Sequence, residues 1–438
     1  MKQHSQIRAV IHLSSTAVYT AVGYFDDHHK KTKIMAIGIA NTDAFFGGQI
    51  INRQHLLSAI HRSVRDAMDM AGLELFDVGL SFANAGMKSF NAVEDAYVMG
   101  DGTHHASGQL ISNEDIRVTL ERAKFALVGK QQSALQLCVQ FVSLDGKQLV
   151  EDAIGMRANQ ISIGYHMMGI PTSYYEQMSD LLRSNNLEMY PSLFDGVVSA
   201  EYVLTDEEKE RGVCFIDIGA GTTSVCLYNK GILLHSQCID IGGQLVDMDI
   251  ASELRISLLE AETLKKQHGS AYAQNRPKGE FITLKKRSGG ELTVNVYELA
   301  SIIEARYQEL FTRIFQEVID AGLIDFMEAG VVLAGGATQM NDLPTLIKHT
   351  FNVPVRAMTI NKQIEVCAKH LSDDNIKLLR NHLKDAKLHS VIGALMYQFS
   401  ERYRQDERHL YGETQATGFF GRFLQQLQYW FDKLRAML

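Results

Sequence analysis

One run of residues has the chemistry expected of a phosphate-binding turn. An apolar strand ends at Asp217, a turn with Gly219 and Gly221 follows, and the hydroxyl side chains of Thr222 and Thr223 come next. Glycines let backbone N–H groups approach an anion without a Cβ in the way, and the threonines add side-chain donors. A carboxylate at the end of the strand can hold Mg²⁺, usually through water, because this ion dehydrates reluctantly. The run therefore predicts a phosphate hairpin with Asp217 as the metal ligand.

The alternative interpretation of this run is an ordinary glycine-rich hairpin that contains an acidic residue. It is not a Walker loop, because no Gly-Lys-Ser/Thr sequence follows. A second segment favours a nucleotide: Glu262 and Lys265 lie three residues apart on a predicted helix that ends at Gly269, so they share one face. The two side chains are candidates to hold a ribose, and the alternative for them is a solvated ion pair.

A third segment, residues 331–337, reads as an apolar strand that ends in small residues. Gly335, Gly336 and Ala337 would let a flat adenine lie against the backbone, and Asp342 is placed to cap the helix that follows. The alternative is a plain strand-to-helix turn. The three segments together predict an ATP site.

Strand and helix patterns alternate along the chain, which is typical of an α/β fold. A helix over 54–71 is expected to end at Gly72, and Ser112 with Asp115 should form a capping box. Two strand–turn–strand units, 7–24 and 213–228, lie about half a chain apart and predict two similar halves facing a cleft. The remaining strands are expected at 136–144 and 159–166, and the remaining helices at 112–127 and 174–186.

The composition predicts a packed protein that does not bind nucleic acid. Hydrophobic residues make up 46% of the 438 residues and charged residues 21%, so a core can form, and the net charge of -8 disfavours nucleic acid. The five cysteines lack metal-site spacing and suggest buried thiols in a reducing compartment. The chain begins with polar residues and contains no apolar run of about 18 residues, so neither a signal peptide nor a membrane span is expected.

The last twenty residues differ from the rest of the chain. Residues 398–417 read as a charged linker, and residues 418–438 predict an amphipathic helix with flanking cations and the single tryptophan, a pattern typical of helices that lie in the headgroup layer of anionic membranes. A helix packed on the protein's own core or in a coiled coil is the alternative. The predicted lipid-facing residues are Phe420, Phe423, Leu424, Leu427, Trp430, Phe431 and Leu434.

The ordered motifs resemble the actin-like ATPase superfamily and, within it, the bacterial FtsA family of cell-division proteins. The resemblance rests on the phosphate hairpin, the helix with Glu262 and Lys265, and the glycine pair at 335–336. Further stretches that match are 47–52, 155–157, 203–208, 302–309 and 391–395.

The resemblance implies an actin-like two-lobed α/β fold around a nucleotide cleft, with an inserted small α+β subdomain. The first lobe would comprise 1–83 and 166–204, the insertion 84–165, the second lobe 205–246 and 310–397, and its upper subdomain 247–309. The linker 398–417 and the membrane helix 418–438 would follow.

The resemblance also implies a peripheral protein on the cytoplasmic face of the bacterial inner membrane, at the division site. Such a protein binds ATP and Mg²⁺, forms filaments, tethers the tubulin-like protein FtsZ and helps to recruit later division proteins. The site for the C-terminal tail of FtsZ would fall on Arg306 and Glu309, where a bidentate arginine suits an acidic peptide. A surface ion pair between these two residues is the alternative.

One motif departs from the family. In the family, the first hairpin carries an acidic residue and a glycine, and this chain has His12 and Ser14 at these two positions. Ser15 can still donate to a phosphate, and His12 would either contact a phosphate as imidazolium or fill space. Nucleotide binding is expected to survive, but hydrolysis should be weak or absent because metal and water positioning supply most of that chemistry. A sugar-kinase-like enzyme and a pilus-assembly platform protein of related fold are the alternative functions.

Overall fold

The computed structural model describes residues 7–99, 108–128, 130–150, 152–285, 289–359, 364–368, 371–400 and 403. The chain divides into two compact units, one formed by Met1–Lys88 and Ser179–Met396, the other by Ser89–Met178 and Tyr397–Leu438. The predicted helix at 418–438 and nearly all of the predicted linker at 398–417 lie outside the described residues, so both stay predictions.

The larger unit contains two mixed sheets, and the first is built on the hairpin predicted near the N-terminus. Its first three strands form an antiparallel meander, and two further strands are added in parallel beside the first. In spatial order the strands are β13 (Glu188–Phe194), β6 (Asp77–Phe82), β1 (Ile7–Leu13), β2 (Ala17–Asp26), β3 (Lys31–Asn41) and β21 (Ile364–Val366).

The second sheet repeats this scheme. A meander of three antiparallel strands is again followed by two parallel strands beside the first strand of the meander. The predicted pair of similar halves is therefore confirmed in topology. In spatial order the strands are β16 (Ile232–Ile239), β15 (Thr223–Asn229), β14 (Val213–Ile218), β19 (Val331–Ala334) and β20 (Val355–Ala357).

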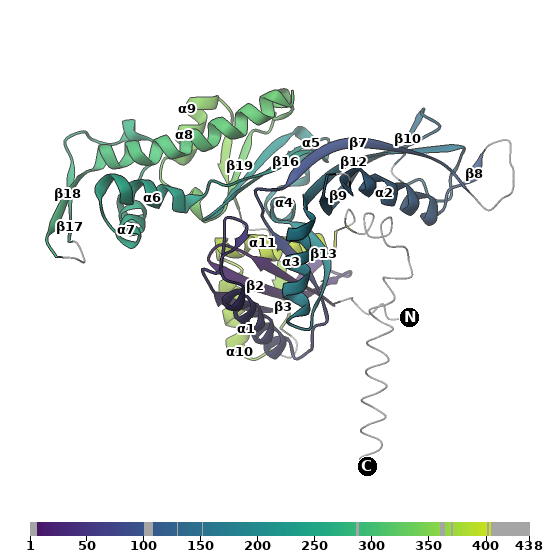
Figure 1. Ribbon diagram of the computed structural model, residues 1–438, viewed down its shortest axis with the longest axis horizontal. Helices are drawn as coiled ribbons and strands as arrows, with labels where there is room; N and C mark the ends of the chain where they lie inside the picture. Colours follow the sequence, from purple (N-terminus) through teal and green to yellow (C-terminus); the bar gives the residue numbers. More distant parts are fainter. Residues whose placement is uncertain are drawn as a thin grey trace, which may run out of the picture. The chain divides into compact units, whose positions relative to one another are not determined.

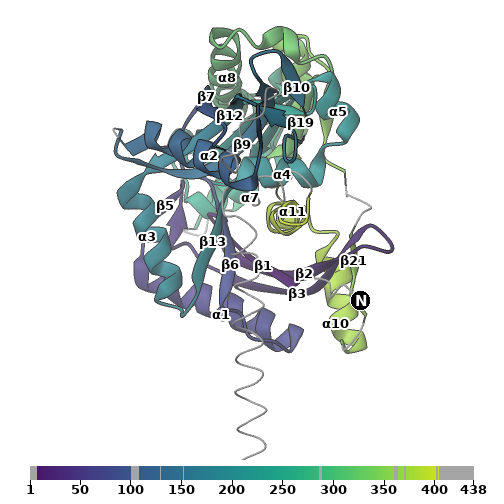
Figure 2. The ribbon, with the colours of Figure 1, turned by 90° about the vertical axis from the view of Figure 1, so that its right-hand side faces the viewer.

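Helices cover both faces of the first sheet (Figures 1 and 2). Helix α1 (Arg53–Ala71) and helix α10 (Asp373–His382) pack on one face, and α11 (His389–Tyr397) lies on the other. Helix α4 (Asp195–Val203) contacts strands of both sheets. A Cβ built at Gly393 of α11 would lie 2.2 Å from the Val198 carbonyl oxygen, so α4 and α11 approach closely only because this residue is glycine. The two helices thereby link the two halves.

The second sheet shares its core with a group of helices. Helix α8 (Val296–Asp320) buries residues at helical spacing, including Ile303, Tyr307 and Ile314, as expected for a one-faced amphipathic helix. The other elements around this core are α6 (Gly243–Leu254), α7 (Leu258–His268), α9 (Leu343–Phe351) and a hairpin of β17 (Phe281–Lys285) and β18 (Glu291–Asn295). Helix α5 (Asp206–Arg211) precedes β14.

The smaller unit has its own sheet and core. Helix α2 (Asn113–Val128) packs on the sheet through Leu120 and Leu127. The insertion was predicted at 84–165. The corresponding segment of the compact unit runs from Ser89 to Met178, and the strand that crosses the predicted boundary, Gln160–Pro171, continues to Pro171. The sheet order is β10 (Gln148–Val150), β9 (Gln132–Leu144), β12 (Gln160–Pro171) and β7 (Lys88–Tyr97); β8 (Gln109–Leu110) pairs with β11 (Arg157–Ala158), and α3 (Thr172–Arg183) follows β12.

Three of the four predicted helix signals are confirmed, including the end of α7 at Gly269. Gly72 ends α1 in a left-handed conformation, and the Ser112 and Asp115 side chains each accept from the other's backbone N–H at the start of α2. The prediction for Asp342 is wrong. Asp342 precedes α9, but its carboxylate accepts from Ser270 Oγ (2.6 Å) and Asn275 Nδ2 (2.9 Å) and does not cap the helix. The carboxylate of Asp342 bonds to these tertiary neighbours instead of to the backbone N–H groups at the start of α9.

The predicted buried thiols are confirmed. The five cysteines are free thiols and all are buried. Within the described part of the chain, no helix combines the length and apolarity needed to cross a bilayer.

Candidate nucleotide-binding site

The second hairpin forms the tight turn that the sequence predicts. Gly219 N–H donates to the Thr222 carbonyl oxygen (2.9 Å), which closes a four-residue turn between β14 and β15. Thr223 is fully buried, and its hydroxyl donates to the Ile241 carbonyl oxygen (2.7 Å). The Thr223 side chain therefore holds the hairpin in place, while Thr222 is partly exposed at the turn. A phosphate contact by Thr222 stays a prediction.

The first hairpin has the same turn. Ser14 N–H donates to the Ala17 carbonyl oxygen (3.1 Å), and the Ser14 hydroxyl donates to the same oxygen (2.9 Å). His12 precedes this turn by two residues, as Asp217 precedes the turn at Gly219. The repeated topology therefore places His12 at the position equivalent to Asp217.

His12 fills space. Its ring is 5% exposed and stacks on Tyr19, and its Nδ1 lies 3.3 Å from Ser81 Oγ. Burial, followed by repulsion from the charge of His389, lowers the pKa of His12 to about 4. The imidazole is therefore neutral near pH 7, which disfavours the alternative in which His12 contacts phosphate as imidazolium.

The two hairpin turns meet. A Cβ built at Gly221 would lie 2.7 Å from Ser15 Oγ and 2.6 Å from the backbone nitrogen of Gly47. Gly47 belongs to the turn between the short strands β4 (Phe45–Phe46) and β5 (Gln49–Ile50). The structure thus brings Ser15 and Gly221 together, and glycine is required at 221 because any side chain would collide with this backbone.

The three predicted motifs converge on one residue, Gly243. A Cβ built there would lie 2.8 Å from Ala337 Cβ, 3.7 Å from Gly219 O and 3.7 Å from Lys265 Nζ. Lys265 Nζ donates to the Gly243 carbonyl oxygen (2.7 Å) and to Asp247 Oδ2 (2.8 Å). Sequence reasoning missed Gly243, although the Gly242–Gly243 pair directly before a helix was a usable signal.

The surroundings of Gly243 contain an unused acceptor and an open surface. Asp247 is 6% exposed, and its Oδ1 has no hydrogen-bond partner among the described residues. A buried acceptor of this kind needs a donor, and a ribose hydroxyl would supply one. Gly336 is exposed, and a Cβ built on it would meet nothing within 4 Å. The arrangement suits a sugar beside Asp247 and a base against Gly336.

Glu262 lies on α7 one turn before its ion-pair partner. Its Oε1 accepts from Lys266 Nζ (2.5 Å), and both side chains are well exposed to solvent. Lys265 and Glu262 do share a face of the helix, as predicted, but they pair with different partners. A ribose contact by Glu262 stays a prediction.

A buried ion pair joins the second hairpin to α11. His389 Nε2 lies 2.6 Å from Asp217 Oδ2, and both residues are almost fully buried. Burial opposes charge on both groups, but their mutual attraction and hydrogen bond lower the pKa of Asp217 and raise the pKa of His389. Sequence reasoning missed His389, because nothing in the local pattern at 389 indicates a partner 172 residues away.

Asp195, at the start of α4, is a further acid beside this pair that sequence reasoning missed. It accepts a hydrogen bond from Ser224 Oγ (2.6 Å). Burial, followed by repulsion from the carboxylate of Asp217, raises the pKa of Asp195 to about 7. Its side chain therefore titrates near neutral pH, unlike an exposed aspartate.

We expect Asp195→Asn to stabilise the protein selectively at high pH. The raised pKa means that stability contributed by protonated Asp195 is lost as pH rises from about 4 to about 7. Asparagine cannot ionise, so the difference in unfolding free energy between variant and wild type should grow by about 1–2 kcal/mol from pH 5 to pH 8, allowing for the partial exposure of the residue.

Urea unfolding at the two pH values measures this difference, with the exposed Asp66→Asn on α1 as the control. The lowered pKa of buried His12 makes the protein more stable as pH rises over about pH 4–6.5. This effect is present in both the wild type and the Asp195→Asn variant, so it cancels in the difference between them. A difference that does not vary with pH would contradict the assignment of Asp195.

The residues fit a nucleotide better than a metal ion. The glycine turns, the Lys265 ammonium and the free oxygen of Asp247 provide donors, charge and an acceptor for a nucleotide. For Mg²⁺, the predicted ligand Asp217 is already bound by His389, and its counterpart in the first hairpin is the neutral His12. Among the described residues, no cluster of three or more histidine, cysteine or acidic side chains could hold a metal.

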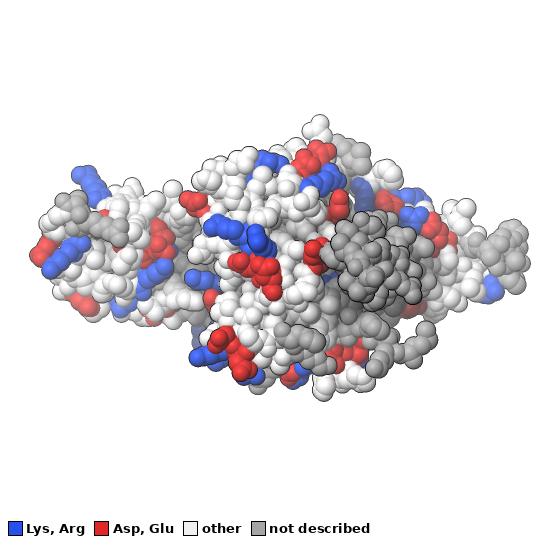
Figure 3. All heavy atoms as spheres, turned by 90° about the horizontal axis from the view of Figure 1, so that it is seen from below, with Lys and Arg blue, Asp and Glu red and all other residues white. Residues whose placement is uncertain are grey.

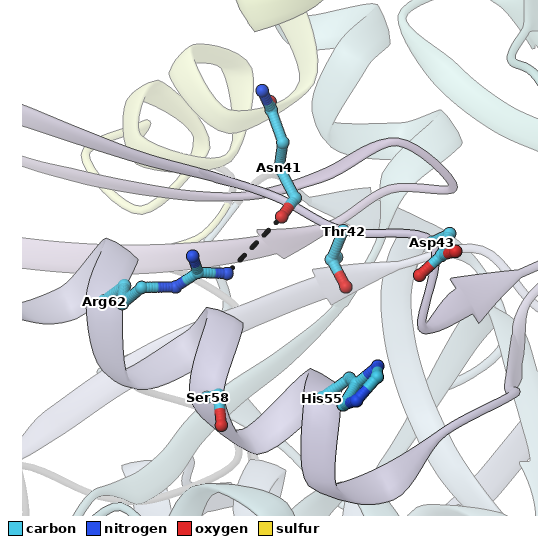
Figure 4. A pocket seen from close by; sticks show the side chains of 6 residues that line it. All are labelled: Asn41, Thr42, Asp43, His55, Ser58 and Arg62. Atoms are coloured by element: carbon cyan, nitrogen blue, oxygen red, sulfur yellow. Dashed lines mark hydrogen bonds between the residues drawn. The ribbon is translucent and has the colours of Figure 1, made fainter.

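A separate surface pocket of about 420 Å³ borders the first hairpin (Figure 4). Thr42 N–H donates to the Thr16 carbonyl oxygen (3.1 Å), and Arg62 Nη2 donates to the Asn41 carbonyl oxygen (3.5 Å). None of the predicted site residues lines this pocket. Its lining comes from the end of β3 and from α1: Asn41, Thr42, Asp43, His55, Ser58 and Arg62.

The predicted partner residues Arg306 and Glu309 lie on α8, outside the three nucleotide motifs in sequence. Arg306 donates in bidentate fashion to Asp249 of α6 (2.7 and 2.8 Å), and its Nη1 donates to Glu309 (2.6 Å). The ion pair with Glu309 that was the alternative interpretation is present. The guanidinium is thus held between two carboxylates and ties α8 to α6.

Charge on the face of the protein drawn in Figure 3 is mixed. On the face drawn in Figure 3, acidic and basic side chains are interspersed and do not gather into one basic patch.

Sequence comparison relates the chain to cell division proteins. Residues 214–393 match the family model of cell division protein FtsA. The chain is 28% identical over 327 residues to cell division protein FtsA of Pseudomonas aeruginosa, covering 74% of this chain and 76% of that protein. It is 24% identical over 412 residues to cell division protein FtsA of Escherichia coli (strain K12), covering 91% of each.

Solved structures agree in fold. A chain of the PilM–PilN type IV pilus biogenesis complex matches with a TM-score of 0.59 at 13% identity, over 90% of this chain and 98% of that chain. MreB5 of Spiroplasma citri bound to ADP matches with a TM-score of 0.51 at 14% identity, over 91% and 98%. Identities this low show the fold alone. The chain is thus similar over most of its length to proteins named cell division protein FtsA, and it has the actin-like fold of these solved structures.

Proposed function

We propose that this protein is an ATP-binding, membrane-attached tether of the division machinery. It would form filaments on the cytoplasmic face of the inner membrane at the division site, hold FtsZ filaments there and help to recruit later division proteins. The observation that carries the proposal is the set of relatives named cell division protein FtsA, which align over most of both chains. The fold also resembles that of a protein in a pilus biogenesis complex, but its sequence identity to this chain, 13%, is lower than that of the FtsA relatives.

ATP binding is supported by the geometry around Gly243. The two hairpin turns, Lys265, Asp247 and the surface at Gly336 offer groups that could contact a phosphate, a ribose and a base. The solved MreB5 of the same fold was determined with ADP bound. We propose that ATP occupies this site as a structural ligand that favours the filament-forming state.

We expect ATP turnover to be slow. His12 is neutral and buried, so the first hairpin supplies no carboxylate to position a metal or a water. Phosphate release by the full-length protein should therefore be well below about 1 s⁻¹, the low end for kinases. A brisker rate would show that another group positions the attacking water.

The proposed site for the acidic FtsZ tail can be tested with opposed variants. Arg306→Glu should weaken tail binding by about tenfold or more, because it replaces a charge-assisted donor by a repelling carboxylate. Asp249→Asn should instead tighten binding, because it removes a carboxylate that now holds the guanidinium. Fluorescence anisotropy with a labelled tail peptide measures both, and ATP binding should be unchanged in each.

Together the two variants distinguish a role of Arg306 in binding the tail from a purely structural role. Each variant removes the ion pair between Arg306 and Asp249 that links α8 to α6, so an effect of lost packing would have the same sign in both. If Asp249→Asn weakens the tail as Arg306→Glu does, Arg306 is a structural tie and the docking site lies elsewhere.

Co-pelleting tests the proposed function as a whole. Full-length protein is mixed with anionic vesicles and FtsZ, with and without ATP, and FtsZ in the pellet is measured. We expect FtsZ to sediment with the vesicles only when this protein is present, and more with ATP. If this protein sediments with the vesicles but FtsZ does not, the proposed tethering is wrong. If this protein does not sediment with the vesicles, the proposed membrane attachment is wrong.

A further inference from the structure

The side chain predicted to hold a metal ion is neutralised by the protein itself. His389 Nδ1 faces the Ala386 carbonyl oxygen (2.7 Å), which can only accept, so Nδ1 carries a proton. His389 Nε2 faces Asp217 Oδ2 at 2.6 Å, and one further proton must lie between these two atoms. Whichever atom carries that proton, the pair of side chains has no net charge.

Both oxygens of Asp217 are covered. Oδ2 contacts the His389 ring, and Oδ1 faces the loop after β19, where a Cβ built at Gly335 would lie only 2.4 Å away. His389 itself is 5% exposed and Asp217 is 6% exposed. Ser390 Oγ lies 3.2 Å from the same Nε2 and accepts from Ser199 Oγ (2.9 Å), so the ring is enclosed by polar partners. A hydrated cation would have to displace this packing to reach the carboxylate.

The pair connects elements that the proposed site depends on. Asp217 is the penultimate residue of β14 and leads into the phosphate turn, and His389 begins α11, which packs against α4. An imidazole at this place supplies the positive partner that a metal would supply in a site with a free carboxylate. Phosphate charge would be met by backbone N–H groups of the hairpin turns and by the ammonium of Lys265, with no metal bridge between Asp217 and the phosphates.

We propose that His389 takes the place of the divalent cation at Asp217, so that this protein binds ATP and ADP without Mg²⁺. The inference rests on the proposed nucleotide binding and adds that His389 is a positioning residue for the phosphate turn. It contradicts the prediction from sequence that Asp217 is a magnesium ligand.

Isothermal titration of the full-length protein with ADP, in Mg²⁺ or in EDTA, tests the inference. We expect the two dissociation constants to agree to within less than about tenfold, because no phosphate contact passes through a metal. Affinity that is about tenfold or more weaker in EDTA overturns the inference and leaves the nucleotide site standing. Absence of binding in both buffers overturns the nucleotide site itself, so the two failures are distinguishable.

A variant then identifies the group responsible. His389→Asn removes the cationic partner and leaves the Asp217 carboxylate to recruit one, so ADP binding should become stronger in Mg²⁺ than in EDTA by about tenfold or more. His61→Asn, on the exposed face of α1, is the matched control and should behave as wild type. Metal-independent binding by a folded His389→Asn protein overturns the assignment to His389. If the variant does not fold, the comparison on the wild-type protein still decides.

Discussion

Removal of residues 418–438 should leave a folded, nucleotide-binding protein that no longer sediments with anionic vesicles. The segment reads FFGRFLQQLQYWFDKLRAML after Gly418, with apolar side chains at helical spacing and Arg422, Lys433 and Arg435 beside them. Such a helix buries its apolar face at the headgroup boundary, and its cations favour anionic lipid. The described elements of the nucleotide site all precede this segment, so nucleotide binding should persist.

The magnitudes predict weak binding by one helix and firm binding by many. Full burial of each large apolar side chain would contribute roughly 1.5–3 kcal/mol. Interfacial insertion is partial, and ordering the backbone costs about 1–2 kcal/mol per residue before hydrogen bonds are counted. A single helix should therefore bind reversibly, whereas a filament presents many helices and can raise attachment by about 10² or more.

Two point variants place the lipid-facing side. Trp430→Glu puts a charge into the apolar stripe and should detach the protein from vesicles. Gln426→Glu lies on the polar side and should weaken binding only slightly, mainly at low salt, because its effect is electrostatic. Vesicle sedimentation measures both. Equal effects would mean that the stripe does not face lipid, and full binding by the truncated chain would place the anchor elsewhere.

Gly336→Val should abolish ATP binding without destabilising the protein. Gly336 is exposed, and a Cβ built on it points into open space with nothing within 4 Å. A valine there is tolerated by the protein but occupies the surface where the adenine is expected to lie. We expect affinity to fall by about a hundredfold or more, measured by isothermal titration, with an unchanged thermal unfolding temperature.

The contrast with other glycines makes this test specific. Gly279→Val is the matched control, because Gly279 is also exposed with nothing within 4 Å of a built Cβ and carries none of the nucleotide motifs. Gly221→Val should also lose ATP, but with reduced stability, because its side chain would collide with Gly47 and Ser15. Normal ATP affinity in Gly336→Val would move the base to another surface.

Local chemistry allowed much of the fold, and the turn on which the candidate site is built, to be predicted from sequence. The strands on either side of the two turns, the end of α1 at Gly72 and the capping box at Ser112 and Asp115 depend on residues that are close in the chain. The same is true of the glycine turn after Asp217, whose backbone path follows from the residue types. Periodicity, caps and turn residues act over a few positions, so they can be read without knowing the tertiary structure.

The partners of charged and polar side chains were decided only by the tertiary structure. Asp217 bonds to His389, Arg306 to Asp249 of another helix, and Asp342 to Ser270 where a cap was expected. Each pairing depends on how distant elements pack, such as α11 against the end of β14, and buried charges must find whatever partner that packing brings near. The spacing of residues along the chain therefore does not predict which of these side chains pair. Sequence alone therefore located the glycine turn after Asp217, whereas the packing of α11 determined that the carboxylate beside this turn faces an imidazole.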